Sequence, residues 1–247
     1  RLENKIKFRS RSQLQELSLF KGHLQCYTYS NAIQEIFCHL QQYQSGGTAM
    51  KVVVIGATGT IGRVVVQAIG NRHEVIPVSF SKSAITADIS DKASIARMFG
   101  KVGKVDAVIS SAGLAKFGSI TSLTDEDYAL GLENKLMGQV NLVRVGMDHV
   151  NDNGSFTLTS GILSRRPMKG SSAISLVNAA LEGFCRAAAL EMPRGIRINV
   201  VSPNWVIDTL KALKMDPSMG TPAEVVAHAY VKALENTMNG EVLDAID

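Results

Sequence analysis

The sequence contains no uninterrupted apolar run of the length that a membrane-spanning helix needs, and it contains only three cysteines. Such a helix requires about 20 consecutive apolar residues, so a membrane protein is not expected. The three cysteines, Cys26, Cys38 and Cys185, do not indicate a disulfide framework, and the expected location is the reducing cytoplasm. A metal site built from His23, Cys26, Cys38 and His39 is not predicted, because adjacent Cys and His side chains rarely converge on one ion in a regular helix.

The chain also lacks a strong excess of charge over most of its length. Its formal net charge is +4, and residues 1–49 carry +3 of this. The remainder is nearly neutral and contains no basic helix with interleaved aromatic residues, so nucleic-acid binding is not expected. What the chain does contain is 45% hydrophobic residues in 247 positions, which is enough for one large domain with a substantial core.

A boundary near residue 49 is indicated by the flexible stretch Ser45–Thr48, which is followed by Met50 and an apolar run. Residues 1–49 are predicted to be an N-terminal extension that is partly helical or disordered, with an amphipathic helix over 31–43. Clustered Arg and Ser near its start are compatible with an organelle transit peptide. A dispensable appendage, native or added for expression, is the favoured interpretation.

From Met50 onward, short apolar runs alternate with longer helical patterns. Strands are expected at Lys51–Ile55, Glu74–Ser79, Ala84–Asp88, Asp106–Ser110, Ser155–Ser160, Arg197–Ser202 and Glu241–Ala245, and helices at 60–70, 91–100, 125–149, 172–191 and 222–236. Strands that are apolar throughout are typical of a parallel sheet covered on both faces. Residues 50–247 are therefore predicted to form a doubly wound Rossmann-type α/β domain, with a seven-stranded, mostly parallel sheet and helices on both faces.

The stretch KVVVIGATGTIGRVVVQAIG, residues 51–70, combines a strand, a glycine turn and a helix. Gly56 permits the tight exit from the strand, Gly59 lets the backbone approach a phosphate, and Gly62 lets the helix and the strand pack closely. The positive end of the helix dipole then faces an anion. Dinucleotide binding is predicted here, with a purely structural turn as the alternative. The residues expected to bind the cofactor are Gly56, Thr58, Gly59, Thr60, Ile61 and Gly62.

The end of the second strand, EVIPVSFSKS, carries no acidic residue from Val78 to Ser83. An acid at this point hydrogen-bonds the adenosine ribose of NAD and repels the 2′-phosphate of NADP. Ser79, Ser81 and Lys82 are instead suited to accept that phosphate. NADP is therefore expected, and NAD is less favoured, unless Lys82 merely decorates a loop.

The domain resembles the short-chain dehydrogenase/reductase family over nearly all of residues 50–247. The resemblance rests on an ordered set of motifs: GATGTIG at 56–62, ADIS at 87–90, SSAG at 110–113, LTSG at 158–161, NAALEGF at 178–184 and GIRINVVSPNWV at 195–206. It implies cofactor contacts at three places, with Asp88 and Ile89 near the adenine, Ser111, Ala112 and Gly113 along the nicotinamide-side ribose, and Pro203 to Val206 beside the nicotinamide.

The family's usual proton-transfer residues are missing from their positions. Working members carry a Tyr, then three residues, then a Lys, and alignment on NAALEGF puts Ile174 at the Tyr position and Asn178 at the Lys position. A phenol with a pKa of about 10 needs a neighbouring ammonium to transfer protons near neutrality. Ile174 has no proton to give. Asn178 is still expected to hydrogen-bond the cofactor ribose, but it supplies no positive charge.

Two residues are candidates for an altered catalytic site. Counting back from Ile174 at the family's usual interval reaches Gly161, and a one-residue difference in the loop would bring Ser160 to the position of the serine that orients the substrate carbonyl. Alignment on Gly138 places Lys135 where the family has an active-site Asn. The Lys135 ammonium is then suited to polarise a carbonyl, with a solvated or structural lysine as the alternative.

Other polar residues invite simpler interpretations. Tyr128 and Tyr230 are conceivable as relocated phenols, but each lies in a helical pattern that packing explains better. Arg165, Arg166 and Lys169 lie in the segment that borders the substrate pocket in this family, where they would recognise an acidic substrate. A solvated loop is the favoured interpretation.

The resemblance and its departures leave two functions open. One is an NAD(P)-dependent oxidoreductase with an altered catalytic site that acts on an unknown small carbonyl or alcohol. The other is a catalytically inactive NADP-binding sensor or scaffold. The helix over 172–191 has more apolar positions than one face against a sheet needs, so a homodimer or homotetramer is expected.

Overall fold

The structure is a computed structural model that describes residues 48–245. The predicted helix over 31–43, and the four His and Cys side chains that were considered as metal ligands, lie outside the described residues.

The domain is built on seven strands that pair in the order β3-β2-β1-β4-β5-β6-β7, and every pair is parallel. The strands are β1 (Lys51–Ile55), β2 (Glu74–Ser79), β3 (Ile85–Thr86), β4 (Val105–Ser110), β5 (Val150–Thr159), β6 (Arg197–Pro203) and β7 (Val242–Ala245). The predicted seven-stranded Rossmann-type sheet is confirmed.

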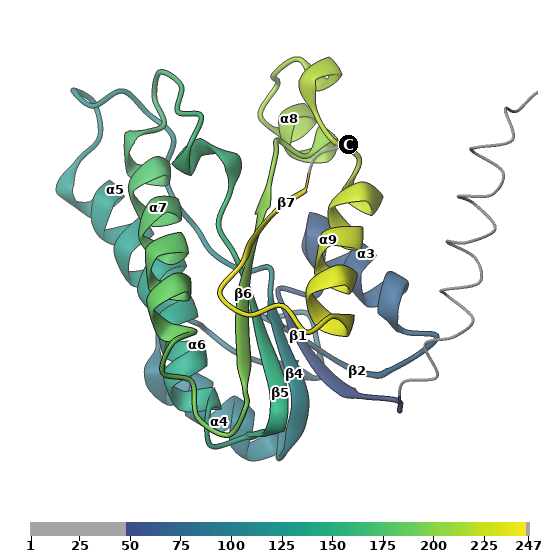
Figure 1. Cartoon of the computed structure of the whole chain (residues 1–247). Coiled ribbons are helices and arrows are strands. Elements are labelled where there is room, and N and C mark those ends of the chain that lie inside the picture. Colours follow the sequence, from purple (N-terminus) through teal and green to yellow (C-terminus); the bar gives the residue numbers. More distant parts are fainter. Residues whose placement is uncertain (1–47, 246–247) are drawn as a thin grey trace, which may run out of the picture. The chain divides into compact units, whose positions relative to one another are not determined.

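Helices cover both faces of this sheet (Figure 1). On one face lie α3 (Thr60–Ile69) and α9 (Ala223–Glu235), and on the other lie α4 (Lys92–Val102), α6 (Gly138–Gly146) and α7 (Ser172–Ala188). Side chains alternate along a strand, so Val52 and Val54 enter one core while Val53 and Ile55 enter the other. Both cores are apolar, which is why the strands read as continuous apolar runs.

Three elements differ from the sequence prediction, and one of them is β5, which begins at Val150 instead of Ser155. The third strand is short because the chain turns at Asp88, whose carboxylate accepts hydrogen bonds from the N–H (2.9 Å) and hydroxyl (2.6 Å) of Ser90. The helix expected over 125–149 is divided into α5 (Asp125–Leu130), a π-helix η1 (Gly131–Met137) and α6. Apolar spacing alone does not distinguish an α-helix from one that contains a wider π turn, and π turns are frequent at functional sites.

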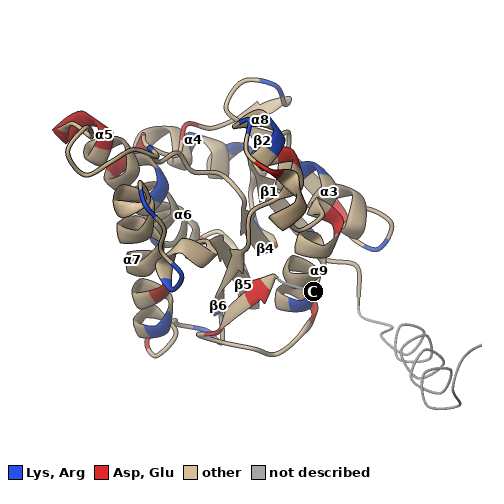
Figure 2. Cartoon of the chain, turned by 90° about the horizontal axis from the view of Figure 1, so that it is seen from above, with Lys and Arg blue, Asp and Glu red and all other residues tan. Residues whose placement is uncertain are grey.

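The remaining elements are too short for periodicity to reveal. They are α8 (Ile207–Ala212) and two 3₁₀ turns, η2 (Ile162–Ser164) and η3 (Pro217–Met219). No helix within residues 48–245 is both long enough and apolar enough to cross a membrane. Seen from above, acidic residues gather on α5, whereas Lys and Arg are spread over several elements (Figure 2).

The strand order reverses at β1, which pairs with β2 on one side and with β4 on the other. A crevice forms outside the carboxyl ends of the strands at such a switch point, and ligands bind there in doubly wound folds. The glycine turn after β1 and the loop after β4 therefore meet where a ligand is expected.

Candidate functional site

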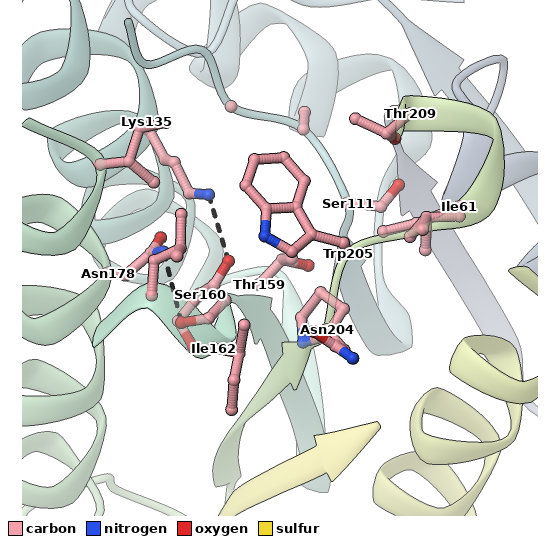
Figure 3. A pocket seen from close by; sticks show the side chains of 17 residues that line it. Ile61, Ser111, Lys135, Thr159, Ser160, Ile162, Asn178, Asn204, Trp205 and Thr209 are labelled. Carbon is pink, nitrogen blue, oxygen red and sulfur yellow. Dashed lines mark hydrogen bonds between the residues drawn. The ribbon is translucent and has the colours of Figure 1, made fainter. Parts of the chain in front are cut away.

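A cavity of about 280 Å³ opens at the carboxyl ends of the strands. Its walls come from the start of α3, the loops after β4, β5 and β6, the π-helix η1, and α7. Figure 3 labels Ile61, Ser111, Lys135, Thr159, Ser160, Ile162, Asn178, Asn204, Trp205 and Thr209 among the lining residues. Four further predicted residues also line it: Ala112, Gly113, Pro203 and Val206. Residues predicted from motifs far apart in the sequence are thus brought to one place.

The glycine turn after β1 leaves the start of α3 open. Gly56 has a φ of +81°, and a Cβ on Gly62 would lie only 2.1 Å from the Gly56 carbonyl oxygen. α3 begins after Gly59 without a side-chain cap and without an acidic residue in its first turn. Thr58 and Gly59 are exposed beside it, and Thr60 is half-buried. The first N–H groups of α3 and the positive end of its dipole are therefore available to an anion.

The segment after β2 is polar and carries no carboxylate. Ser81 and Lys82 are exposed, and the preceding Phe80 is 74% exposed. The Lys82 N–H donates a hydrogen bond to the Ser79 hydroxyl (2.7 Å), which fixes the backbone at this point. No ion pair in the described part of the chain involves the Lys82 ammonium. Its charge is therefore available to a phosphate.

The two residues expected near the adenine lie in the turn after β3. Asp88 is half-buried, and one of its carboxylate oxygens is occupied by Ser90. Ile89 is buried, and a Cβ on Gly138 would lie 2.9 Å from its side chain. The Ile89 side chain thus packs against α6, and any contact of this residue with a ligand is left to its backbone.

Lys135 extends from the π-helix η1 into the cavity (Figure 3). Its Nζ donates a hydrogen bond to the Ser160 carbonyl oxygen (3.1 Å). Gly113, with a φ of +152°, makes room for this side chain, because a Cβ there would lie 2.8 Å from Lys135 Cγ. Burial lowers the pKa of the Lys135 ammonium from 10.5 to about 8. Lys135 is half-buried, which does not match the alternative of a solvated lysine.

Gln139, which the sequence did not single out, fastens this helix to β5. Its buried side chain donates to the carbonyl oxygens of Lys135 (3.1 Å) and Thr159 (2.9 Å) and accepts from the Thr159 N–H (2.8 Å). These bonds hold the backbone of Lys135 against the end of β5. Ser160 follows Thr159, so the same bonds fix the position of Lys135 relative to Ser160.

Ile174 and Asn178 both line the cavity from α7. Asn178 Nδ2 donates to the Gly161 carbonyl oxygen (3.3 Å). Its Oδ1 is buried and has no hydrogen-bond partner among the described residues. An unsatisfied buried acceptor costs about 1–3 kcal/mol, so a ligand hydroxyl that donates to it would be stabilising.

The hydroxyl of Ser160 is bound to a buried carboxylate, Glu182, which the sequence analysis missed. Ser160 Oγ donates to Glu182 Oε1 (3.1 Å), and Ser164 Oγ donates to the same oxygen (2.6 Å). Glu182 lies one helical turn after Asn178, and a lone acid on an apolar helix face was the available signal. The role of the Ser160 hydroxyl toward a substrate stays a prediction, while its carbonyl holds Lys135.

Arg165 is exposed, as the interpretation of a solvated loop expects, but its guanidinium is held by two carboxylates. Its Nε lies 3.7 Å from Glu182 Oε2, and its guanidinium also pairs with Asp244 of β7 and donates to the Ser202 hydroxyl (3.0 Å). These contacts tie the loop after β5 to the last two strands. Arg166 and Lys169 are exposed.

Glu182 Oε2 also lies 3.5 Å from Nη2 of Arg186, one helical turn further along α7. We predict that Glu182→Gln destabilises the domain, because the amide carries no charge opposite Arg165 and Arg186. Hydrogen bonds to a buried charged group contribute more to stability than bonds to a neutral group. The expected loss is about 1–3 kcal/mol in the free energy of unfolding. Urea denaturation measures it, with Glu191→Gln, an exposed acid, as the control. A change within about 0.5 kcal/mol, typical of surface substitutions, would show that Glu182 does not hold the loop.

Trp205, which lies in the stretch from Pro203 to Val206 that was expected beside the nicotinamide, also lines the cavity. In the view of Figure 3, its indole lies between Lys135 and Ser111. Its ring contacts Phe117 edge to face, with centroids 6.2 Å apart and an interplanar angle of 73°. The aromatic pair joins the loop after β6 to the loop after β4, so the position of Trp205 in the cavity wall depends on both loops.

The two tyrosines occupy structural positions. Tyr128 pairs through its hydroxyl with Ser172 (2.9 Å), and Tyr230 is fully buried with its hydroxyl against Thr159. Thr159 has one hydroxyl hydrogen and directs it to the Ser110 carbonyl oxygen, so Tyr230 must be the donor in the tyrosine–threonine bond. Burial raises the pKa of Tyr230 well above its ordinary value.

We expect Tyr230→Phe to lower the free energy of unfolding by about 1 kcal/mol, the net value of one hydrogen bond. Turnover should be unchanged, because Thr159 keeps its bond to Ser110. Thermal unfolding and steady-state kinetics on the same preparation provide the two readouts. Loss of turnover with intact cofactor binding would instead identify Tyr230 as a relocated proton donor.

The fold and the site define a nucleotide-binding domain of the doubly wound class, and comparison with known proteins supports this. The family model described as Enoyl-(Acyl carrier protein) reductase matches residues 52–239. The protein lin1944 from Listeria innocua is 40% identical, with a TM-score of 0.77 over 80% of this chain and 100% of that chain. A small-chain dehydrogenase in complex with NADPH is 28% identical, with a TM-score of 0.71 over 81% of this chain and 97% of that chain.

Among curated proteins, human 3-oxoacyl-[acyl-carrier-protein] reductase is 29% identical over 176 residues, which are 65% of this chain and 74% of that protein. The matched part spans about half the length of several other curated relatives. The chain belongs to the short-chain dehydrogenase/reductase family of oxidoreductases, as the motifs predicted. Its domain has the NAD(P)-binding Rossmann fold of that family.

Proposed function

We propose that this protein is an NADP-dependent oxidoreductase that interconverts a small carbonyl compound and an alcohol, with Lys135 in place of the family's usual proton-transfer pair. The observation that carries the proposal is the meeting of two features in one cavity. Ile61 at the open start of α3 and the Lys135 ammonium both line it. An anion-binding helix end that shares a cavity with a half-buried proton donor suits a dinucleotide and a reacting carbonyl.

The residues present fit the cofactor. The Gly56–Gly62 turn leaves a cradle that a Cβ on Gly59 would narrow, since it would lie 3.2 Å from the Gly56 carbonyl oxygen. The buried Asn178 Oδ1 is an acceptor without a donor, which suits a ribose hydroxyl. The absence of an acid after β2, together with the exposed Ser81 and Lys82, favours the 2′-phosphate of NADP. The similar dehydrogenase in complex with NADPH supports the same choice.

The cofactor, when bound, supplies a hydride. The chain's own contribution is to supply and hold the proton. The Ser160 carbonyl fixes one N–H of Lys135, and the remaining N–H groups are directed to a carbonyl oxygen in the cavity. Negative charge that develops on this oxygen is stabilised by the ammonium, which then gives up a proton. A pKa of about 8 suits this task near neutrality better than the ordinary 10.5.

A catalytically inactive NADP-binding sensor is the second candidate function. It is favoured by Ile174, which has no proton to give, and by the Ser160 hydroxyl, which is bound to Glu182. Under this alternative Lys135 would bind a ligand without any reaction. The two candidates share the cofactor site and differ only in turnover.

Turnover on a broad panel of aldehydes, ketones and oxo acids separates the two candidates. The loss of NADPH absorbance is followed with each compound, after NADPH and NADH affinities have been measured by calorimetry. The proposal predicts that NADPH binds more tightly than NADH and that one class of carbonyl is reduced. Tight NADPH binding with no reduction across the panel would favour the sensor.

Self-association through α7 is also proposed. Leu176 of α7 is 48% exposed, and Leu132 and Met137 of the neighbouring η1 are each more than a third exposed. Exposed apolar side chains on adjacent helices favour a partner surface of the same kind. Light scattering after size exclusion would report a homodimer or homotetramer, and a monomer at micromolar concentration would contradict this proposal.

A further inference from the structure

No acidic side chain in the described part of the chain pairs with Lys135, and the nearby Glu182, which binds the Ser160 hydroxyl, is already paired with Arg165 and Arg186. Lys135 is the only ionisable side chain among the residues that line the cavity. Within the described part of the chain, no ion pair involves the Lys135 ammonium. Its hydrogen-bond acceptor is the neutral carbonyl of Ser160. Holding a desolvated cation without a counter-ion is unfavourable. An anion that enters the cavity would therefore be attracted to this position.

The geometry of the ammonium narrows the kind of anion. An ammonium has three N–H groups, and the Ser160 carbonyl uses one. The two that remain are close together on one nitrogen, so they suit two acceptor oxygens on neighbouring carbon atoms. The carboxylate and the carbonyl of a 2-oxo acid have this arrangement, and a neutral ketone has only one such oxygen.

The size and polarity of the cavity indicate how large and how polar the rest of the ligand is. The cavity volume of about 280 Å³ is already below the usual 300–1,000 Å³ of ligand sites, and the nicotinamide end of the cofactor would share it, so the space left for a substrate is small. Ile162, Leu163 and Ile174 give the cavity apolar walls, and no lining residue is acidic. A small aliphatic side chain suits these walls, and a negative charge meets no repulsion from the lining.

We propose that the substrate is a small 2-oxo acid with an aliphatic side chain, bound through its carboxylate and carbonyl oxygens to Lys135. The inference rests on the proposed oxidoreductase function. In the reaction, C2 accepts the hydride of the reduced nicotinamide, and the carbonyl oxygen accepts a proton from Lys135. The products are a 2-hydroxy acid and the oxidised nicotinamide, and Lys135 regains its proton from water.

The test compares 2-oxobutanoate with its methyl ester, which has the same skeleton without the charge. We expect kcat/KM to be about 100-fold or more higher for the acid, as for a desolvated charge pair. Lys135→Met should abolish the preference, and Lys101→Met, which changes an exposed lysine in the last turn of α4, should leave it intact. Equal use of the ester, or of 2-butanone, would overturn the inference while the proposed oxidoreductase function stands.

Binding of oxamate, an unreactive analogue of a 2-oxo acid, gives a readout that does not depend on turnover. Calorimetry on the NADPH-loaded protein should detect oxamate, with an affinity that is constant below about pH 8 and falls tenfold per pH unit above it, because the ammonium must stay protonated. Failure of oxamate to bind to the loaded protein would overturn the inference. Failure of NADPH itself to bind would overturn the proposed function and this inference with it.

Discussion

Replacing Lys135 by Met lowers kcat/KM for the carbonyl substrate by about 10²–10⁴-fold, the usual contribution of a positioned proton donor. The affinity for NADPH should change little, because Lys135 is not among the residues at the start of α3. In the unmodified protein the rate is constant below about pH 8 and falls above it, since the ammonium form is the active one. This break in the pH profile should be absent from the variant.

The same substitution should make the domain more stable. The folded-state pKa of Lys135 is lowered by burial, so the unfolded chain binds this proton more tightly than the folded chain does. The penalty is fully present below about pH 8 and is relieved as the pH rises from there to 10.5. At pH 7, Lys135→Met should therefore raise the free energy of unfolding by roughly 1–3 kcal/mol.

Urea denaturation at pH 7 measures this gain, with Lys169→Met as the control. A variant that is both less stable and still active would show that Lys135 is a structural residue. Greater stability together with lost turnover is the pattern expected of a residue retained for chemistry.

Gly59→Val should weaken NADPH binding by about 10–100-fold, or roughly 1.4–2.8 kcal/mol, because the added side chain would stand at the exposed start of α3, where the pyrophosphate is expected to bind. Gly59 has φ −78° and ψ 174°, which valine adopts without strain. Its Cβ would lie 3.2 Å from the Gly56 carbonyl oxygen, and its methyl groups would occupy the approach to the start of α3. The fold should survive while the phosphate site is obstructed.

The matched control is Gly100→Ala in α4, where a Cβ meets no atom within 4 Å. Removal of a helical glycine should stabilise the domain by about 0.5–1 kcal/mol and leave the NADPH affinity unchanged. Calorimetric titration with NADPH compares the two variants. Unchanged affinity in Gly59→Val would mean that the dinucleotide does not approach this turn.

The fold could be predicted from the sequence because buried strands and tight turns each require a recognisable residue pattern. Buried parallel strands read as apolar runs, and Gly56 and Gly62 mark positions where no side chain fits. The end of the third strand was missed because it depends on the Asp88 side chain bonding to Ser90, which is a local competition with the sheet.

The candidate site could be predicted only in part. The order of the motifs was enough to predict that Lys135, Asn178 and Gly113 line one site, because the topology places the carboxyl ends of the strands together. The role of Glu182 and the contact of Trp205 with Phe117 were missed because both depend on partners far away in the sequence. Side-chain direction is set by packing, and linear spacing does not encode it.

We expect the start of α3 to bind a nicotinamide dinucleotide whose reactive end enters the cavity beside Lys135. Trp205 is the only tryptophan of the chain and lines that cavity, so its fluorescence reports an occupant directly. Titration with NADPH should quench this emission saturably and excite emission from the bound nucleotide by energy transfer, and NADH should require a higher concentration. An unchanged tryptophan signal with both nucleotides, together with no heat of binding, would contradict the account.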